Sequence, residues 1–298
     1  MIIPKKLRIG DKIGIISTAR KITLEELSPA IKMLESWGLK VVLGANLFSE
    51  DNQFSGTIQQ RSADLQSMID DRSIKAILCA RGGYGTVQII DIIDFSNLKN
   101  NPKWIIGYSD VTVLHSHLNN LGIASLHATM PINFEKNTEG SLISLKNSLF
   151  GNMKSTTCTV HSFNKLGIAE AEVVGGNLSI LYSLLGSDSD VNTDGKILFI
   201  EDLDEYLYHI DRMMMNLKRN GIFTKLKGLI VGGMSDMNDN AIPFGKTGKE
   251  IILEHTKDYD FPICFGFPAG HLDDNRCIRL GVKSVLEINE NGVSLSQE

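Results

Sequence analysis

The segment IIGYSDVTVLH, at residues 105–115, places a serine where it could act as a nucleophile. Ser109 directly follows an apolar strand and precedes a helix. A serine on such a sharp turn is held out at the end of a sheet, with the following amides directed at the group that it attacks. The same position also suits an N-cap formed by Ser109 or Asp110. Gly107 matches the first glycine of a G-x-S-x-G elbow, whereas Val111 occupies the place of the second.

A second candidate is ARGGYGT at residues 80–86, which also lies at the end of a predicted strand. Adjacent glycines let the backbone turn its N–H groups inward and form a nest that binds an anion. The segment has neither the G-K-[ST] ending of a P-loop nor G-x-G-x-x-G spacing, which argues against nucleotide phosphate binding. Two interpretations stay open: a tight turn that requires positive φ, or an oxyanion donor that faces Ser109.

An acidic cluster follows another apolar strand, in KILFIEDLDE at residues 196–205. Glu201 stands directly at the strand end, where a carboxylate could orient an imidazole from elsewhere in the fold. No histidine is adjacent in sequence, and a solvated loop or a divalent-metal site would produce the same pattern. The four carboxylates are Glu201, Asp202, Asp204 and Glu205.

Of the seven histidines, His271 is the best candidate for a general base. It follows Pro268-Ala269-Gly270 in a loop between two predicted strands. His127, at the end of another strand, is its main competitor. Asp273 or Asp274 could also bind a metal together with His271. The remaining five fit surface or packing positions: His115, His117, His161, His209 and His255.

The first half of the chain alternates apolar strands with amphipathic helices, which indicates a parallel sheet covered on both faces. Ligands bind beyond the carboxyl ends of such strands, so the turns at residues 17–19, 81–85 and 107–110 are the positions to inspect. The predicted strands are 12–17, 39–46, 74–80, 104–108 and 124–128. The predicted helices are 23–38, 57–70, 86–93, 111–120 and 142–150.

The second half is richer in strands and predicts a smaller α+β domain. We therefore expect an α/β domain over residues 1–150 that carries the elbow serine, a linker over 151–165, and a β-rich domain over 166–298. The last two predicted strands should form a hairpin. The strands are 169–177, 196–202, 228–234, 262–267, 277–282 and 284–289, and the two helices are 206–220 and 248–256.

Composition excludes several classes of protein. The chain has 298 residues, 42% of them hydrophobic and 22% charged, with a net charge of -5. A dedicated nucleic-acid binder would carry a basic face, and a membrane span would need about 18 consecutive apolar residues. No signal-peptide pattern and no C-x-x-C pair occurs. We expect a reduced, cytoplasmic protein without a metal or other cofactor, in which Cys79, Cys158 and Cys264 are small buried thiols.

Five motifs, in this order, resemble the LD-carboxypeptidases (muramoyl-tetrapeptide carboxypeptidases) of serine peptidase family S66, which also includes the microcin-C immunity peptidases. Each motif is common by chance, but five in the family's order are specific. They extend over most of the chain. The motifs are RGGYG at 81–85, GYSD at 107–110, GGNL at 175–178, EDLDE with IDRM at 201–213, and PAGH at 268–271.

The resemblance implies a role for each matching residue. Ser109 corresponds to the nucleophile, Glu201 to the orienting acid and His271 to the general base, while the amides of Gly83 and Asp110 correspond to the oxyanion hole. It also implies an N-terminal α/β domain joined to a smaller β-rich domain, a homodimer, and a murein tetrapeptide substrate that loses its terminal D-alanine.

A carboxypeptidase must also recognise a free carboxylate, which guanidinium groups bind in a bidentate fork. Arg81 and Arg212 are the candidates, although ion pairs with the acidic cluster at 201–205 would explain them equally well. Tyr84 and Asn177 complete the predicted substrate-binding set.

Three alternatives remain. A peptidase of the microcin-C branch would act on peptidyl-nucleotides, but no long insertion precedes His271 as in that branch. An α/β-hydrolase esterase shares the order Ser, acid, His, but Val111 departs from its elbow and the second half does not continue the β–α alternation. A non-catalytic two-domain binding protein would bind a small ligand without turnover.

Overall fold

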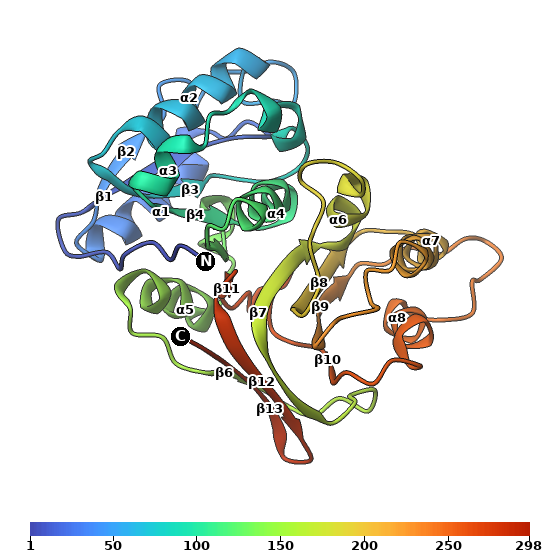
Figure 1. Cartoon of the computed structure of the whole chain (residues 1–298). Coiled ribbons are helices and arrows are strands. Elements are labelled where there is room, and N and C mark those ends of the chain that lie inside the picture. Colours follow the sequence, from blue (N-terminus) through green and yellow to red (C-terminus); the bar gives the residue numbers. More distant parts are fainter.

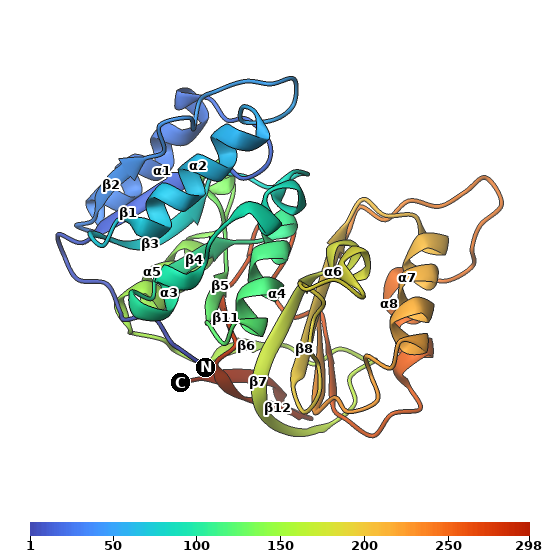
Figure 2. The same ribbon diagram turned by 45° about the horizontal axis from the view of Figure 1, so that its top comes forward.

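The computed structural model describes residues 1–298 and contains two β-sheets, each with its own helices (Figure 1). The first sheet has six strands in the order β11-β5-β4-β3-β1-β2, and the second has seven in the order β10-β9-β8-β7-β12-β13-β6. This arrangement confirms the predicted fold class, a parallel-sheet α/β unit followed by a second, strand-rich unit. It places the carboxyl ends of strands from both sheets near the junction between them (Figure 2).

The first sheet is parallel except at one edge. Its parallel strands are β1 (Lys12–Ile16), β2 (Lys40–Leu43), β3 (Ile74–Cys79), β4 (Trp104–Gly107) and β5 (Ser125–His127). The helices are α1 (Leu24–Ser36), α2 (Ile58–Asp70), α3 (Ser96–Asn100), α4 (Thr112–Asn120) and α5 (Glu139–Phe150). The turns that follow β1, β3 and β4 therefore meet at one edge of the sheet.

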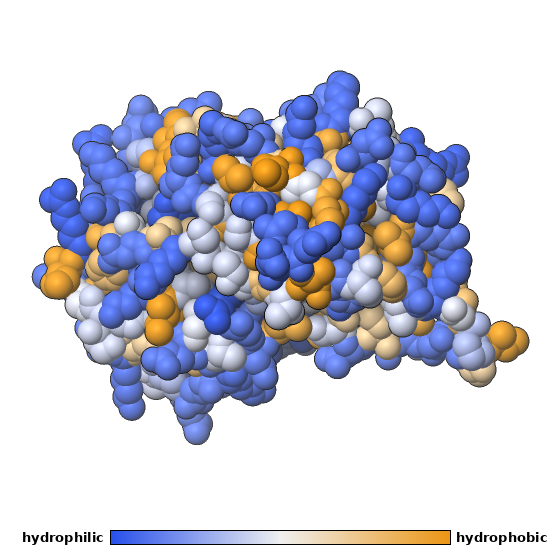
Figure 3. Space-filling view, turned by 90° about the horizontal axis from the view of Figure 1, so that it is seen from below, coloured by the Kyte–Doolittle hydropathy of each residue, from blue (hydrophilic) through white to orange (hydrophobic).

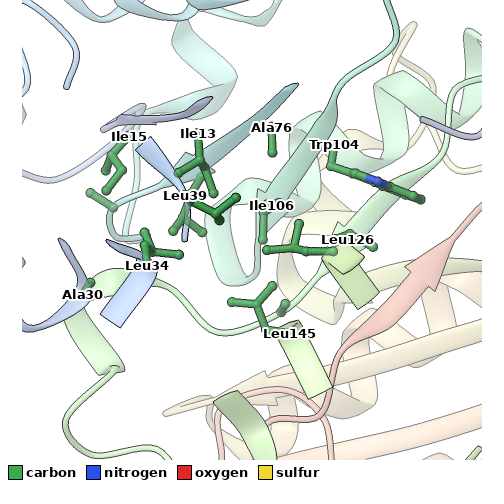
Figure 4. Packing of buried hydrophobic residues seen from close by; sticks show 14 of the residues in the cluster. Ile13, Ile15, Ala30, Leu34, Leu39, Ala76, Trp104, Ile106, Leu126 and Leu145 are labelled. Atoms are coloured by element: carbon green, nitrogen blue, oxygen red, sulfur yellow. The ribbon is translucent and has the colours of Figure 1, made fainter. Parts of the chain in front are cut away.

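Side chains from alternate positions of each strand fill two cores on opposite faces of this sheet. Ile13 and Ile15 of β1 pack with Leu34 of α1 and Leu145 of α5, whereas Ile16 packs on the other face with residues of α2 and α4. Figure 4 shows the first of these cores, with Trp104 at its edge. Packed side chains thus cover both faces, so the strand ends are where a ligand is expected to bind.

The second sheet is mixed. Strands β7 (Gly167–Asn177), β8 (Ile197–Leu203), β9 (Gly228–Ser235) and β10 (Ile263–Phe265) are parallel, whereas β12 (Lys283–Asn289), β13 (Gly292–Gln297) and β6 (Thr156–Cys158) add antiparallel. The three helices α6 (Leu178–Leu184), α7 (Leu207–Arg219) and α8 (Gly248–Thr256) pack on one face. The carboxyl ends of β7 and β8 lie side by side, since Asn177 pairs with Glu201 in register.

The predicted hairpin between residues 277–282 and 284–289 is wrong. Strand β11 (Ile278–Leu280) crosses to the first sheet and pairs antiparallel with β5, while β12 forms its hairpin with β13. Apolar residues alone do not select a strand's partner, and Gly281, at φ +78°, turns the chain away between the two strands. The C-terminal half therefore contributes a strand to the N-terminal sheet.

Other differences are local. The helix predicted over 86–93 is two 3-10 turns, Thr86–Gln88 and Ile90–Ile92, because eight residues without an N-cap side chain cannot offset the cost of nucleating an α-helix. The predicted linker at 151–165 contains strand β6, and the sequence patterns did not predict α3, α6 or β13. Cys277 is buried, whereas Cys158 is only half-buried.

The face of the molecule seen in Figure 3 is ordinary. Figure 3 shows a mostly hydrophilic face on which apolar side chains lie in small groups. No helix combines the length and the apolar character needed to cross a membrane. The chemistry therefore has to be sought at the sheet ends.

Candidate active site

Ser109 lies directly beyond β4 on a strained turn. Its φ is +62°, a left-handed value that costs a non-glycine residue about 1–3 kcal/mol. Gly107, at φ +158°, has no room for a side chain, because a Cβ there would lie 2.8 Å from Cγ2 of Val111. Val111 thus fills the space beneath the turn, which explains how this elbow forms without its second glycine.

The glycine loop at 81–85 packs against this turn. A Cβ built on Gly82 would lie 2.9 Å from Cβ and 3.0 Å from Oγ of Ser109, so the loop backbone borders the hydroxyl. The N–H groups of Gly82 and Gly83 donate to no backbone acceptor. Arg61 fixes the loop from below, donating from Nη1 to the carbonyl of Gly85 at 2.9 Å. The arrangement is a nest with free donors beside a hydroxyl.

Asp110 ties the two turns together. Its carboxylate is buried and accepts a 2.8 Å hydrogen bond from the N–H of Thr86, just beyond the glycine loop. Burial raises the pKa of Asp110, although its hydrogen bonds to Thr86 and the nearby Arg61 oppose this. The side chain therefore has a structural task, and its backbone N–H is the group that follows Ser109.

Glu201 and His271 form a buried hydrogen-bonded pair. Oε2 of Glu201 accepts from Nδ1 of His271 at 2.7 Å and from the His271 backbone N–H at 3.1 Å. A β-bulge between β8 and β9 aims Glu201 at the loop. Gly270, at φ +107°, has to be glycine, because a Cβ there would lie 2.6 Å from Oε2 of Glu201. With Nδ1 engaged, Nε2 is the nitrogen of His271 that remains available.

The electrostatics of this pair favour a charged imidazole. Burial alone would lower the pKa of His271, but the charge and hydrogen bond of Glu201, with the charge of Asp202, outweigh it and raise the pKa. Asp202 is itself buried, and burial followed by repulsion from Glu201 raises its pKa to about 7. Asn177 donates to Asp202 at 2.9 Å. The fully buried Glu201 is the group that stabilises positive charge on the ring.

The loop that carries His271 has one end in each sheet, because it runs from β10 to β11. It is also fixed laterally, since the N–H of Thr138 donates to the carbonyl of Asp273 at 2.9 Å and Oγ1 of Thr138 donates to Asp274 at 2.6 Å. Asp274 also pairs with Arg276 at 2.6 Å. The imidazole is therefore placed over the end of the first sheet.

Ser109 and His271 line the same open cavity of about 570 Å³. The ring of Tyr108 lies edge-on to that of His271, with 4.8 Å between the ring centroids. The hydroxyl of Tyr108 donates to Oδ1 of Asn133 at 3.2 Å. The hydroxyl, the glycine nest and the acid-backed imidazole thus meet in one space. The residues that line it are Arg20, Glu26, Arg81, Gly82, Gly83, Tyr108, Ser109, Met130, Ile132, Asn133, Glu135, Lys136, Leu203 and His271.

Comparison with known proteins assigns both halves of the chain. The family model of the LD-carboxypeptidase N-terminal domain matches residues 13–128, and that of the LD-carboxypeptidase C-terminal domain matches residues 170–286. The chain belongs to the LD-carboxypeptidase family. This confirms the resemblance carried by the five motifs.

Individual relatives extend along nearly the whole chain. A Bacillus subtilis protein named "Probable murein peptide carboxypeptidase" is 38% identical, over 96% of this chain and 92% of its own length. The microcin C7 self-immunity protein MccF of Escherichia coli is 25% identical, over 98% and 95%. The crystal structure of muramoyltetrapeptide carboxypeptidase from Oxalobacter formigenes shares the fold, with a TM-score of 0.87 at 24% identity, over 96% of this chain and 98% of that one.

Within this LD-carboxypeptidase fold, three of the predicted substrate-binding residues lie outside the cavity lining. The ring of Tyr84 packs against that of Phe54, with 6.3 Å between the ring centroids. Cζ of Arg212 lies 5.1 Å from the ring centroid of Tyr208. Asn177 is the buried N-cap of α6 and the hydrogen-bond partner of Asp202, so it supports the site from behind.

Arg81 does line the cavity, but it is already engaged. It donates to the carbonyl of Lys21 at 3.1 Å and faces Glu26 at 4.0 Å. Neither Arg81 nor Arg212 forms the ion pair with the acidic cluster at 201–205 that the sequence left open. Glu205 of that cluster instead binds His209 at 2.6 Å.

The competing base, His127, lies in the core. Neither ring nitrogen has a hydrogen-bond partner. The ring packs edge-on to that of Phe199, with 4.8 Å between the ring centroids. Burial lowers the pKa of His127 well below its usual value. Such an imidazole is neutral and has no access to Ser109's cavity, so His271 is the histidine placed for chemistry.

Sequence reasoning missed three residues at this site. Gly82 borders Ser109, Asp202 lies behind Glu201, and Arg20 crosses the face of Gly83. Asp202 and Gly82 lay inside motifs that had been recognised for their neighbours. Arg20 follows the strand-end turn at 17–19 by one residue, so the signal was the position of that turn.

Proposed function

We propose that this LD-carboxypeptidase family member is a serine carboxypeptidase that hydrolyses the L,D peptide bond of murein tetrapeptides and releases terminal D-alanine. The observation that carries the proposal is the Glu201–His271 pair, which lies on the same cavity as a serine held on a strained elbow. The name of the Bacillus subtilis relative, which matches this chain over nearly its whole length, supports murein peptides as the substrate class.

In the proposed reaction, Oγ of Ser109 attacks the carbonyl carbon of the scissile bond while Nε2 of His271 takes the hydroxyl proton. Glu201 keeps Nδ1 protonated and stabilises the imidazolium as it forms. The tetrahedral intermediate then collapses, His271 gives its proton to the nitrogen of D-alanine, and D-alanine leaves. Water, activated by the same imidazole, hydrolyses the acyl-enzyme.

The oxyanion of the intermediate is proposed to bind the backbone N–H groups of Gly83 and Asp110. Gly83 belongs to the nest whose donors have no backbone acceptor, and Asp110 directly follows the nucleophile. Preorganised donors of this kind each stabilise the transition state by about 3 kcal/mol. The helix N-terminus behind Ser109 adds a favourable potential for negative charge.

Mass spectrometry of synthetic tetrapeptides tests the proposal. The peptide with an L-centre at the diamino acid should lose D-alanine, whereas the epimer with a D-centre should not. Ser109→Ala should reduce turnover by up to about 10⁶-fold, because the other groups of a triad act only through the nucleophile. D-alanine release at a near-wild-type rate by this variant would refute the assignment.

A peptidyl-nucleotide of the microcin-C type and a p-nitrophenyl ester form the comparison arms. Preferential cleavage of the peptidyl-nucleotide would support the activity that the name of the Escherichia coli relative suggests. Preferential cleavage of the p-nitrophenyl ester would support a general esterase, and tight binding without any turnover would support a binding protein.

We also propose that the protein acts as a homodimer in the cytoplasm, as the family resemblance implies. Size-exclusion chromatography with light scattering distinguishes a dimer from the 32.9 kDa monomer. Fractionation of the producing cells tests the compartment.

A further inference from the structure

Arg20 places an unpaired cation in the proposed active-site cavity. Its aliphatic stem lies across Gly83, where a Cβ would be 2.6 Å from Cδ and 2.7 Å from Nε of Arg20. The arginine ion pairs of the chain are Arg81–Glu26 and Arg276–Asp274, so Arg20 belongs to neither. Its backbone is anchored, because its carbonyl accepts a hydrogen bond from Oγ of Ser17. The exposed side chain thus lies against the glycine loop, and its guanidinium donates to no protein group.

The other cations of the cavity are less well placed. Arg81 is bound to the carbonyl of Lys21 and faces Glu26. Lys136, which is exposed like Arg20, lies on the loop that follows β5, next to Glu135 in the chain and without a contact to the glycine loop. Only Arg20 is both unpaired and packed against Gly83, the residue whose N–H is proposed to bind the oxyanion.

Covalent geometry specifies where a terminal carboxylate must lie. Its carbon is separated from the scissile carbonyl carbon by one nitrogen and one Cα, a span of at most about 4 Å. A group that binds this carboxylate must therefore lie within a few ångströms of the oxyanion hole, which is the position of Arg20.

We propose that Arg20 binds the free α-carboxylate of the terminal residue in a bidentate fork and so restricts the reaction to the last peptide bond. The inference rests on the proposed function and names the group of the substrate that one residue recognises. No covalent step is added, since Arg20 only orients the leaving residue.

The test compares two tetrapeptides that differ only in the terminal group, a free acid and a primary amide. Wild-type enzyme should cleave the acid with a kcat/KM about 100-fold higher than the amide, as expected for the loss of one charge-assisted bidentate contact. Arg20→Met keeps an unbranched stem over Gly83. It should lose about 100-fold on the acid while staying within about threefold of wild type on the amide.

Two further variants complete the experiment. Arg20→Lys keeps the charge but not the fork and should fall between the two. Arg72→Met removes an exposed arginine of the α2–β3 turn, outside the cavity, and should leave the acid-to-amide ratio unchanged. Thermal unfolding of each variant verifies folding.

The outcomes separate the two proposals. If wild type prefers the acid and Arg20→Met retains that preference, the role of Arg20 is overturned while the carboxypeptidase proposal stands. If Lys136→Met loses the preference for the acid instead, the role of Arg20 is also overturned. If wild type releases neither D-alanine nor its amide, the proposed function fails and the inference fails with it.

Discussion

Replacement of Glu201 by Gln would remove the charge behind His271 while keeping the shape of the side chain. The carboxylate is fully buried, and Oε2 accepts two N–H groups of His271, while Oε1 has no partner. An amide NH₂ at the Oε2 position would face these donors. An amide NH₂ at the Oε1 position would be buried without an acceptor. The first orientation disfavours the ring tautomer that the reaction needs, whereas the second keeps the amide oxygen as the acceptor of Nδ1–H. Neither orientation supplies the negative charge that stabilises the imidazolium.

The expected loss follows from these contacts. Hydrogen bonds to a charged group contribute about 1.5–3 kcal/mol each, and loss of the acid from a Ser-His-acid triad costs up to about 10⁴ in kcat. We therefore expect Glu201→Gln to lower kcat by about 10³- to 10⁴-fold. Substrate binding should change little, because Glu201 does not line the cavity.

The pH profile supplies a second, independent readout. The reaction needs a neutral His271, so kcat/KM should fall as the pH drops through the pKa of this ring. Since the charge of Glu201 helps to raise that pKa, its removal should move the acid limb of the profile to lower pH. A variant that was merely less well folded would lower activity at every pH without moving the limb.

The assay is D-alanine release over pH 4.5–9, with Glu205→Gln as the matched control. Glu205 belongs to the same acidic cluster but binds His209 instead of the site, so its variant should keep kcat within about twofold and an unmoved acid limb. A Glu201→Gln enzyme with near-wild-type kcat, or a Glu205→Gln enzyme with the larger loss, would refute this account of the site.

Two other substitutions test the packing around the site. Gly82→Ala should lower kcat about 10- to 100-fold with little change in melting temperature, because its Cβ would lie 3.0 Å from Oγ of Ser109 at a backbone position without positive φ; unchanged turnover would mean that the loop yields freely. His127→Leu should make stability less sensitive to acid. The buried ring, whose pKa burial lowers, resists the proton that an unfolded imidazole takes up below about pH 6.5, so wild type should lose about 2 kcal/mol more than the variant in urea unfolding between pH 8 and pH 5. Equal losses would contradict the burial argument.

The sequence predicts much of this site because its chemistry is local. Ser109, the glycine nest and Glu201 each stand at the end of an apolar strand, and such positions can be identified from a few neighbouring residues. The first sheet was predictable for the same reason, since its parallel strands alternate with amphipathic helices. What the sequence could not provide was the arrangement of these pieces relative to one another.

The wrong partner of residues 277–282 has a physical cause, which is long-range pairing. Residues 277–282 have an apolar pattern that fits either sheet, and only the assembled fold selects β5 as the partner of β11. A local signal for the true hairpin did exist, since Asn291-Gly292 is a typical turn dipeptide between β12 and β13. Arg20 was missed because its contact with Gly83, a residue distant in the sequence, is visible only in the folded chain.

The path of β11 also bears on how the proposed reaction is held together. A loop between two independent lobes would let His271 move away from Ser109 whenever the lobes separate. Here the loop leaves β10 of the second sheet and enters β11 of the first, where Ile278 pairs opposite His127. Thr138 fixes the same loop by two hydrogen bonds. The imidazole is therefore attached to the sheet that presents Ser109, although Glu201, the acid behind it, belongs to the other sheet.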